Sequence, residues 1–294
     1  MTNPDVKSPD AQNPDVRRTA VRKIDIRKVA TYTVLTLAAL ATLAPVIWTV
    51  LSSMRPPSES LATDSSVIPS SLDLSSYPAV FREVNMWMLI LNSVLVTALI
   101  AVGQMLSAAM AGYVFARFEF RGKNLLFALI LATMMVPMQV IIVPVFMLVR
   151  GMGLADTLLA LILPAVPTAF GTFLMRQYFL GLPAELGEAA ELDGAGPWRT
   201  FISVYAPLAM PGMAIVGILA FNTHWNEFFR PLIMTISEQN FTLPLGLVSL
   251  QGNMGTGSVA TVLAGVVLSM IPAFLVFVFG QRTLREGLTA GSHR

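Results

Sequence analysis

Six long apolar segments without Asp, Glu, Lys or Arg constrain this chain more than any other feature. They cover residues 29–54, 88–113, 125–149, 157–175, 207–225 and 259–280. A helix of about 20 apolar residues crosses the hydrocarbon core of a membrane. The sequence therefore predicts an all-α membrane protein with six transmembrane helices. Pro164 and Pro167 interrupt the fourth segment, and neighbouring helices can satisfy the carbonyl groups that such prolines free.

The placement of Lys and Arg predicts the orientation of these spans. Fifteen of the 19 basic residues lie in the N-terminus, the 114–124 loop, the 176–206 loop and the C-terminus, which six spans place on one side. Basic residues accumulate on the cytoplasmic side of a membrane, so both termini are expected in the cytoplasm. The segments 55–87 and 226–258 then face outward, either as connectors or as docking surfaces for an external partner.

The remaining composition sets the domain organisation and excludes some chemistry. Residues 1–28 hold few large apolar side chains, so a disordered cytoplasmic tail is expected there. Residues 29–281 form the membrane domain, and residues 282–294 form a cytoplasmic C-terminal tail. The chain has no cysteine and only two histidines, far apart in sequence. Disulfides, thiolate metal sites and thiol catalysis are thereby excluded, and no metal site is expected.

The polar stretch 181–206, here called the acidic loop, interrupts this apolar chain. Pro183 suits the first turn of a helix, and the residues from 184 to 193 are mostly good helix formers. Gly194 can end that helix in the left-handed conformation. Pro197 can begin a second short helix that reaches about Tyr205, and Pro207 then opens the fifth span. The acidic loop is thus expected to fold as helix, turn and helix along the membrane surface.

The first of these helices has two distinct faces. Leu186, Ala189 and Ala190 share one face by their spacing, and Glu185 and Glu188 share a neighbouring one. Small alanines permit close approach by another protein, and carboxylates pair with basic groups. This helix is therefore either a knob for a soluble partner or a solvated amphipathic connector.

The chain resembles the permease subunits of binding-protein-dependent ABC importers. Their cytoplasmic signature is EAA, three residues, Gly, nine residues, Ile, any residue, Leu and Pro. This sequence has Glu188-Ala189-Ala190, Gly194, Val204 at the Ile position and Pro207, with Ala206 in place of Leu. Further short segments match the maltose-type second permease, which belongs to the carbohydrate-importer branch of this family. They are Asn92-Ser93, the segments 113–117, 122–123, 173–177, 183–186, 193–195 and 225–227, and the tail segments 281–282 and 287–291.

The resemblance implies a type I ABC importer transmembrane domain in the cell membrane of a prokaryote. Two different permease subunits would form one translocation path, and an extracytoplasmic solute-binding protein would deliver the solute. A dimer of cytoplasmic ATPases would grip the acidic loop, through residues that match the signature or adjoin it. Those residues are Glu188, Ala189, Ala190 and Gly194, with Asp193 and Arg199 as additional contacts. The C-terminal residues 287–291 are also expected near the ATPases.

The chain carries no phosphate-binding loop of its own. That loop requires G-x-x-x-x-G-K-[ST], but Gly122-Lys123 is followed by Asn124, and Arg117 occupies the position of the earlier glycine. We therefore expect a non-catalytic subunit that binds no cofactor. ATP and Mg²⁺ would be used by the partner ATPase, and nucleic acid is not expected as a partner.

The solute path is expected to lack fixed charge, because no Asp, Glu, Lys or Arg lies within the spans. This favours a neutral solute such as a sugar and makes a proton-coupled carrier less suitable. Amides can bond to sugar hydroxyls, and an indole can stack on a sugar ring. The same side chains also bond between membrane helices, which leaves a structural role open. The candidate path residues are Asn92, Gln139, Asn222, Trp225, Asn226 and Glu227, with Gln139 preferred.

Two other classes remain open on these observations. A secondary transporter or channel would carry a small polar solute without an ATPase. A membrane scaffold or anchor would need neither a long kinked bundle nor a solute path.

Overall fold

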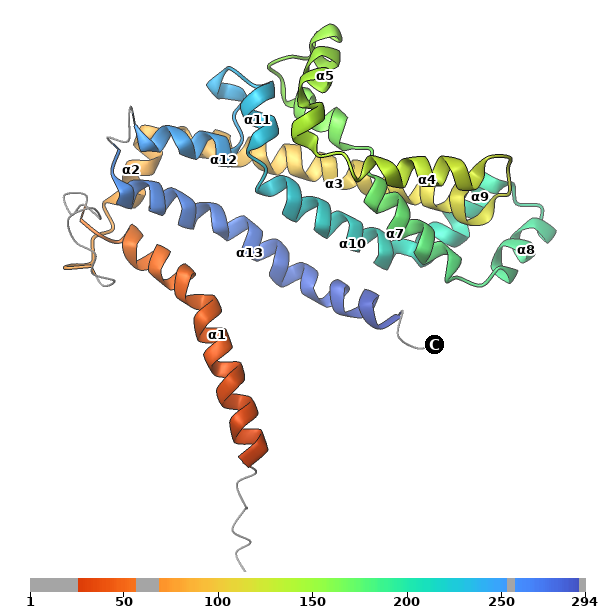
Figure 1. Ribbon diagram of the computed structural model, residues 1–294, viewed down its shortest axis with the longest axis horizontal. Helices are drawn as coiled ribbons and strands as arrows, with labels where there is room; N and C mark the ends of the chain where they lie inside the picture. Colours follow the sequence, from red (N-terminus) through yellow and green to blue (C-terminus); the bar gives the residue numbers. More distant parts are fainter. Residues whose placement is uncertain (1–25, 57–68, 253–256, 291–294) are drawn as a thin grey trace, which may run out of the picture. The chain divides into compact units, whose positions relative to one another are not determined.

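The computed structural model describes residues 26–56, 69–252 and 257–290, without the side chains of Ile26, Val29 and residues 282–290. The expected tail 1–28 therefore lies almost wholly outside the described residues, as do residues 291–294. The chain divides into two compact units, Met1–Ile47 and Trp48–Arg294. Helix α1 (Ile26–Ser53) begins in the first unit (Figure 1). Its apolar stretch Ala30–Ser53 is long enough to cross a membrane.

The second unit supplies the other candidate spans. Helix α3 (Met86–Arg117) and helix α13 (Val259–Ala290) are long and apolar, and so is the continuous helix Pro197–Trp225. Two further spans are bent pairs of helices. One joins α4 (Lys123–Thr133) to α5 (Met138–Gly151) through a 102° bend. The other joins α6 (Leu158–Ile162) and η1 (Leu163–Ala165) to α7 (Ala169–Leu180) through a 42° bend.

The expected third span is therefore not one straight helix. Pro137 adopts an extended backbone, with ψ near 139°, and follows a turn at residues 134–136. A residue that precedes proline is disfavoured in the helical region, which explains why α4 ends before this point. Pro144, in contrast, lies within α5 without ending it.

The fifth span also differs from the sequence expectation, because it begins ten residues before Pro207. Helix α9 (Pro197–Thr200) continues through the π-helical turn η2 (Phe201–Tyr205) into α10 (Ala206–Trp225). Proline lacks the N–H of a regular helical hydrogen bond. Pro207 lies in the first turn of α10, directly after the π-helical turn η2, so the helix continues through this proline.

The core of the second unit forms where α3, α7 and α10 pack together (Figure 1). A methyl group on Gly112 would lie 2.6 Å from Cβ of Met175 and 2.8 Å from the backbone nitrogen of Arg176. Only a glycine permits α3 and α7 to approach this closely. The buried cluster beside this contact is formed by Ala108, Ala109, Tyr113, Met175, Phe179, Phe201, Tyr205, Ala209, Met213 and Val216.

A second part of the core packs short helices from the 226–258 segment onto α2 (Ser76–Glu83), α3 and α13. These short elements are η3 (Glu238–Asn240), α12 (Leu243–Gly246) and η4 (Leu247–Gln251). The preceding helix α11 (Phe229–Met234) packs instead on α5 and α6. Leu243, Leu247 and Leu250 are buried there together with Val80 and Met86. Much of the expected 226–258 connector is therefore folded.

Asp156 fastens this folded segment to the turn between α5 and α6. Its carboxylate accepts hydrogen bonds from the backbone N–H groups of Ile236 and Ser237, at 2.8 and 3.0 Å, and from the Ser237 hydroxyl. Asn240 donates to the Asp156 carbonyl at 2.6 Å. These bonds, led by that of the Ser237 hydroxyl, hold the pKa of the Asp156 carboxyl well below its ordinary value. The side chain therefore remains a charged acceptor.

Replacement of Asp156 by Ala should release the segment from Ile236 to Asn240. We expect amide hydrogen exchange at Ile236 and Ser237 to accelerate by about tenfold, the scale of one lost charge-assisted hydrogen bond. Asp156→Asn is the matched control, because Asn also tolerates the positive φ of 55° found at this position. It should accelerate exchange less. Unchanged exchange in Asp156→Ala would show that other contacts hold the segment.

Candidate functional site

The first helix of the acidic loop ends as the sequence predicts. Helix α8 (Glu185–Leu192) is followed by Gly194 with φ of +77°. The Ala195 N–H donates to the Ala190 carbonyl, and the Gly194 N–H donates to the Glu191 carbonyl, both at 2.9 Å. This pair of bonds is a Schellman motif, which satisfies the last carbonyl groups of a helix. The predicted left-handed stop at Gly194 is thus confirmed.

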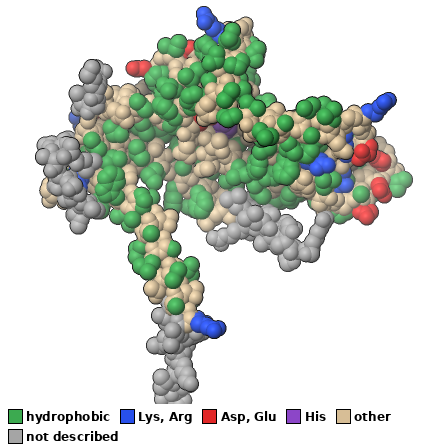
Figure 2. All heavy atoms as spheres, viewed as in Figure 1, with side chains coloured by type: hydrophobic (Ala, Val, Ile, Leu, Met, Phe, Trp, Pro, Cys, Tyr) green, Lys and Arg blue, Asp and Glu red, His purple; other side chains and the backbone are tan. Residues whose placement is uncertain are grey.

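The faces of α8 differ in part from the expectation. Ala190 is buried, Leu186 is half-buried and Ala189 is exposed, so the three residues do not present one common face to solvent. Glu185 and Glu188 are exposed, as expected for a polar face. Glu191, Asp193 and Arg199 are exposed as well. Figure 2 shows acidic and basic side chains gathered at the end of the molecule that holds α8 and α9.

Two large apolar side chains stand among these charges. Leu192 is 90% exposed and Trp198 is 63% exposed, one on each side of the Gly194 turn. Neither residue is among the site residues predicted from the sequence. The sequence could have indicated them, because each is a large apolar side chain beside the glycine in an otherwise acidic stretch. A surface of this kind, with apolar anchors inside a charged rim, is typical of protein interfaces.

Arg117 joins the acidic loop to the membrane helices. Its Nη2 donates to the carbonyl oxygens of Phe179 and Leu182, each at 2.7 Å, where α7 ends. Its guanidinium carbon lies 4.7 Å from the centre of the Tyr205 ring. The ring of Tyr113 packs against those of Phe179 and Tyr205, at centroid distances of 5.8 and 5.3 Å. The ends of α3 and α7 are thereby fixed to η2.

A cavity of about 310 Å³ lies beside α8, next to the point where Gly187 packs directly against the Tyr205 ring. It is lined by Glu188 and Glu191 on one side and by Tyr113, Arg117 and Tyr205 on the other. Helix α8 therefore rests on η2, which Arg117 and Tyr113 connect to the ends of α3 and α7.

The candidate path residues from the sequence do not converge on one place. Asn92 is buried and donates from Nδ2 to the carbonyls of Gln239 and Phe241, at 2.8 and 3.0 Å. Gln139 is exposed in the first turn of α5. Asn222 and Asn226 are exposed, and the Asn226 amide donates to the Asn222 carbonyl at 2.9 Å. In this structure Asn92 fastens α3 to the 226–258 segment.

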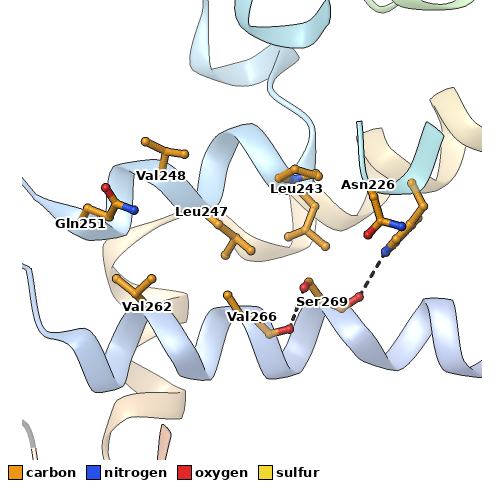
Figure 3. Close-up of a pocket in the computed structure, with 10 residues that line it drawn as sticks. Asn226, Leu243, Leu247, Val248, Gln251, Val262, Val266 and Ser269 are labelled. Atoms are coloured by element: carbon orange, nitrogen blue, oxygen red, sulfur yellow. Dashed lines mark hydrogen bonds between the residues drawn. The ribbon is translucent and has the colours of Figure 1, made fainter. Parts of the chain in front are cut away.

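A cavity of about 290 Å³ lies between α12, η4 and α13, with Leu247 and Val266 among its lining residues (Figure 3). Trp225 is buried beside this cavity. Its indole N–H donates to the Ser269 carbonyl at 3.2 Å. Its ring stacks on Phe221, with centroids 5.4 Å apart. The polar edge and one face of this indole are therefore occupied by the protein itself.

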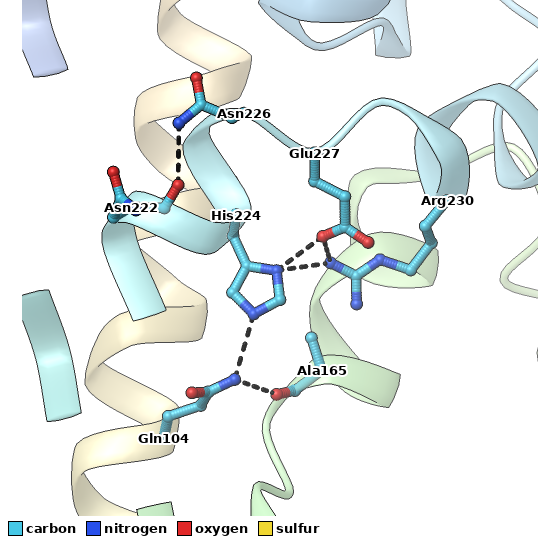
Figure 4. Close-up of polar contacts among 7 residues, drawn as sticks. All are labelled: Gln104, Ala165, Asn222, His224, Asn226, Glu227 and Arg230. Atoms are coloured by element: carbon cyan, nitrogen blue, oxygen red, sulfur yellow. Dashed lines mark hydrogen bonds and ion pairs between the residues drawn. The ribbon is translucent and has the colours of Figure 1, made fainter. Parts of the chain in front are cut away.

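Glu227 belongs to a polar network that joins three parts of the second unit (Figure 4). The network consists of Gln104, His224, Glu227 and Arg230. His224 Nδ1 lies 2.6 Å from Glu227 Oε2, which also accepts from Arg230 Nη2. On the other side of the ring, His224 Nε2 lies 3.1 Å from Gln104 Nε2. Burial lowers the pKa of Arg230, and the charge of Glu227 opposes that shift.

Only Glu227 of this network was predicted from the sequence, and Gln104, His224 and Arg230 were not. Gln104 is the member of the network farthest from Glu227 in the sequence. It lies inside the 32-residue helix α3 and donates at 2.7 Å to the carbonyl of Ala165 in η1. The sequence did indicate that Gln104 makes a polar contact, because an amide within an apolar span requires a hydrogen-bond partner. Its contacts on η1 and α10 depend on the three-dimensional fold.

The long apolar helices, the two bent pairs and the exposed acidic loop define a polytopic permease with the transmembrane fold of type I importers. The chain belongs to the family of binding-protein-dependent transport system inner membrane components, whose match covers residues 106–285. It is 36% identical to the arabinooligosaccharides transport system permease protein AraQ of Halalkalibacterium halodurans, over 86% of this chain and 91% of that protein.

Other relatives extend this similarity. The trehalose transport system permease protein SugB of Mycobacterium tuberculosis is 35% identical over 87% of this chain and 94% of its own. A crystal structure of a bacterial ABC transporter involved in the import of the acidic polysaccharide alginate also matches. One of its chains aligns with a TM-score of 0.75 and 26% identity, over 89% of this chain and 97% of that chain. The expected family and fold class are thus confirmed.

Proposed function

We propose that the chain is the permease subunit of an ATP-driven importer for a sugar or sugar-like solute. It would contribute half of the translocation path and pair with a second, different permease subunit. The single observation that carries this proposal is the family match together with relatives named for sugar transport. The spans without fixed charge support a neutral solute.

The acidic loop is proposed as the contact with a cytoplasmic ATPase dimer, in which ATP and Mg²⁺ would be bound. Glu188, Asp193 and Arg199 are exposed and available to pair with charged groups of that partner. Gly194 shapes the turn, Ala189 leaves room for close approach, and the buried Ala190 seats α8 on its own protein. Both termini would then be cytoplasmic. An extracytoplasmic solute-binding protein is the proposed partner on the opposite side.

The path residues Gln139, Asn222 and Asn226 remain proposals for contact with the solute. Their side chains are exposed on the isolated subunit, where a second permease would face them. For Asn92, Trp225 and Glu227 the contacts described above favour a structural contribution to the path.

The function is tested by reconstitution of the full complex, with both permeases, the ATPase dimer and the binding protein, in liposomes. Uptake of radiolabelled trehalose, lactose and arabino-oligosaccharides is measured with ATP on the ATPase side. We expect uptake of at least one sugar, and its complete loss when the ATPase carries a substitution that abolishes hydrolysis. Uptake that survives this substitution would instead indicate a secondary transporter or channel.

A further inference from the structure

A second cavity, of about 300 Å³, lies among α3, α7 and α10. Its polar lining residues, here called the polar wall, are Gln104, Thr168, Thr223 and His224. Its apolar lining residues include Phe170 and Leu219. None of the path residues predicted from the sequence lines this cavity. We call this space the polar cavity.

The amide of Gln104 is fixed in one orientation at the edge of the polar cavity. Its nitrogen donates to the Ala165 carbonyl, which can only accept, and also to His224 Nε2. Its oxygen points away from both partners (Figure 4). Among the residues that the structure describes, no hydrogen-bond donor reaches this oxygen. Gln104 therefore presents an acceptor that is not used by the protein.

His224 joins the polar cavity to a charged pair behind it. Its Nε2 lies 3.1 Å from Gln104 Nε2, and its Nδ1 lies 2.6 Å from Glu227 Oε2 and 3.1 Å from Arg230 Nη2. Glu227 in turn pairs with Arg230. Neither Glu227 nor Arg230 lines the polar cavity. No Asp, Glu, Lys or Arg is thus among the residues that line the polar cavity, which suits a neutral solute.

Two threonines complete the polar wall. Thr168 accepts at Oγ1 from the N–H of Gly171, at 3.1 Å, and its own hydroxyl hydrogen is not used in the described part of the chain. Thr223 is exposed, and its hydroxyl forms no hydrogen bond within the described ranges. With Gln104, the wall offers an acceptor, a donor, and a hydroxyl that can act as either.

We propose that the polar cavity is a solute subsite on this subunit, which takes one hydroxylated ring of the transported sugar. The proposal rests on the proposed function. Sugar hydroxyls would bond to Gln104 Oε1 and to the two threonines, and the apolar face of the ring would lie against Phe170 and Leu219. Ligand pockets occupy about 300–1,000 Å³, so this volume fits a single ring better than a whole oligosaccharide.

The absence of cysteine makes a direct test possible. Thr223→Cys is placed in the complete complex, trapped with its binding protein and a non-hydrolysable ATP analogue. A small uncharged maleimide then labels the single thiol of this subunit, which is separated from its partners before the label is counted, with and without the sugar that the complex imports. We expect the sugar to slow labelling by about tenfold. The matched control is Thr133→Cys, an exposed position at the end of α4 that does not line the cavity.

A functional measurement accompanies the labelling. Thr223→Val removes one hydroxyl and should reduce uptake at low sugar concentration by about threefold to tenfold, the effect of one lost hydrogen bond. Thr133→Val should transport normally. If the complex imports a sugar but that sugar neither protects Thr223→Cys nor is affected by Thr223→Val, the subsite is wrong and the importer function stands. If no sugar is imported at all, the proposed function fails first.

Discussion

Gly194→Val should uncouple ATP hydrolysis from solute uptake while the protein still folds and inserts. The φ of +77° at this position is costly for a β-branched residue, by roughly 1–2 kcal/mol. The side chain itself meets no atom within 4 Å, so the strain falls on the exposed turn and not on the core. We expect uptake per ATP hydrolysed to fall by at least about tenfold in the reconstituted complex, because the Schellman motif would open and reposition α8.

A nearby glycine provides the control for this substitution. Gly196 also has open space around it, but its φ is −71°. Gly196→Val should therefore retain most coupling. Glu188→Lys, which reverses an exposed charge on α8, is expected to uncouple in the same direction as Gly194→Val. Normal transport by both Gly194→Val and Glu188→Lys, with the ATPase bound, would contradict the coupling role of the acidic loop.

Gly112→Ala should destabilise the membrane domain as a whole. The added methyl group would lie 2.6 Å from Met175 Cβ and 2.8 Å from a backbone nitrogen, so α3 and α7 must separate. Overpacking of this kind costs about 1–3 kcal/mol, which corresponds to a drop of about 2–5 °C in melting temperature for a protein of this size. Thermal unfolding of the purified subunit in detergent measures the shift.

Gly151→Ala is the matched control for that measurement. Gly151 ends α5, and a methyl group there would meet nothing within 4 Å. Its melting temperature should stay unchanged or rise slightly, since alanine favours a helix more than glycine does. Equal melting temperatures for the two variants would show that α3 and α7 are not held at the distance that the structure gives.

Local chemistry predicted the parts of the fold that depend on neighbouring residues alone. Apolar length located the spans, and the backbone freedom of glycine located the stop at Gly194. The prolines were harder to interpret, because the consequence of a proline depends on the turn around it. Pro137 follows a turn that redirects the chain by 102°, whereas Pro144 and Pro211 lie inside continuous helices.

For the polar residues, the local sequence gives even less indication of which groups they contact. Nothing in the sequence near Asn92 indicates that its amide would meet carbonyls almost 150 residues away. Gln104 and His224 lie 120 positions apart. In the sequence, each is simply one polar residue within an apolar span. Their pairing depends on the packing of α3 against α10, which in turn depends on small residues that no local pattern identifies as contacts.

The continuous helix from Pro197 to Trp225 has a mechanical consequence. At 1.5 Å per residue, its 29 residues extend for about 40 Å. One end carries Trp198 and Arg199 of the acidic loop, and the other carries Thr223 and His224 of the polar cavity. A tilt imposed at the first end reaches the second along one unbroken backbone, which passes through the π-helical turn η2. The same rod would therefore sense the state of the ATPase and set the shape of the space around the solute.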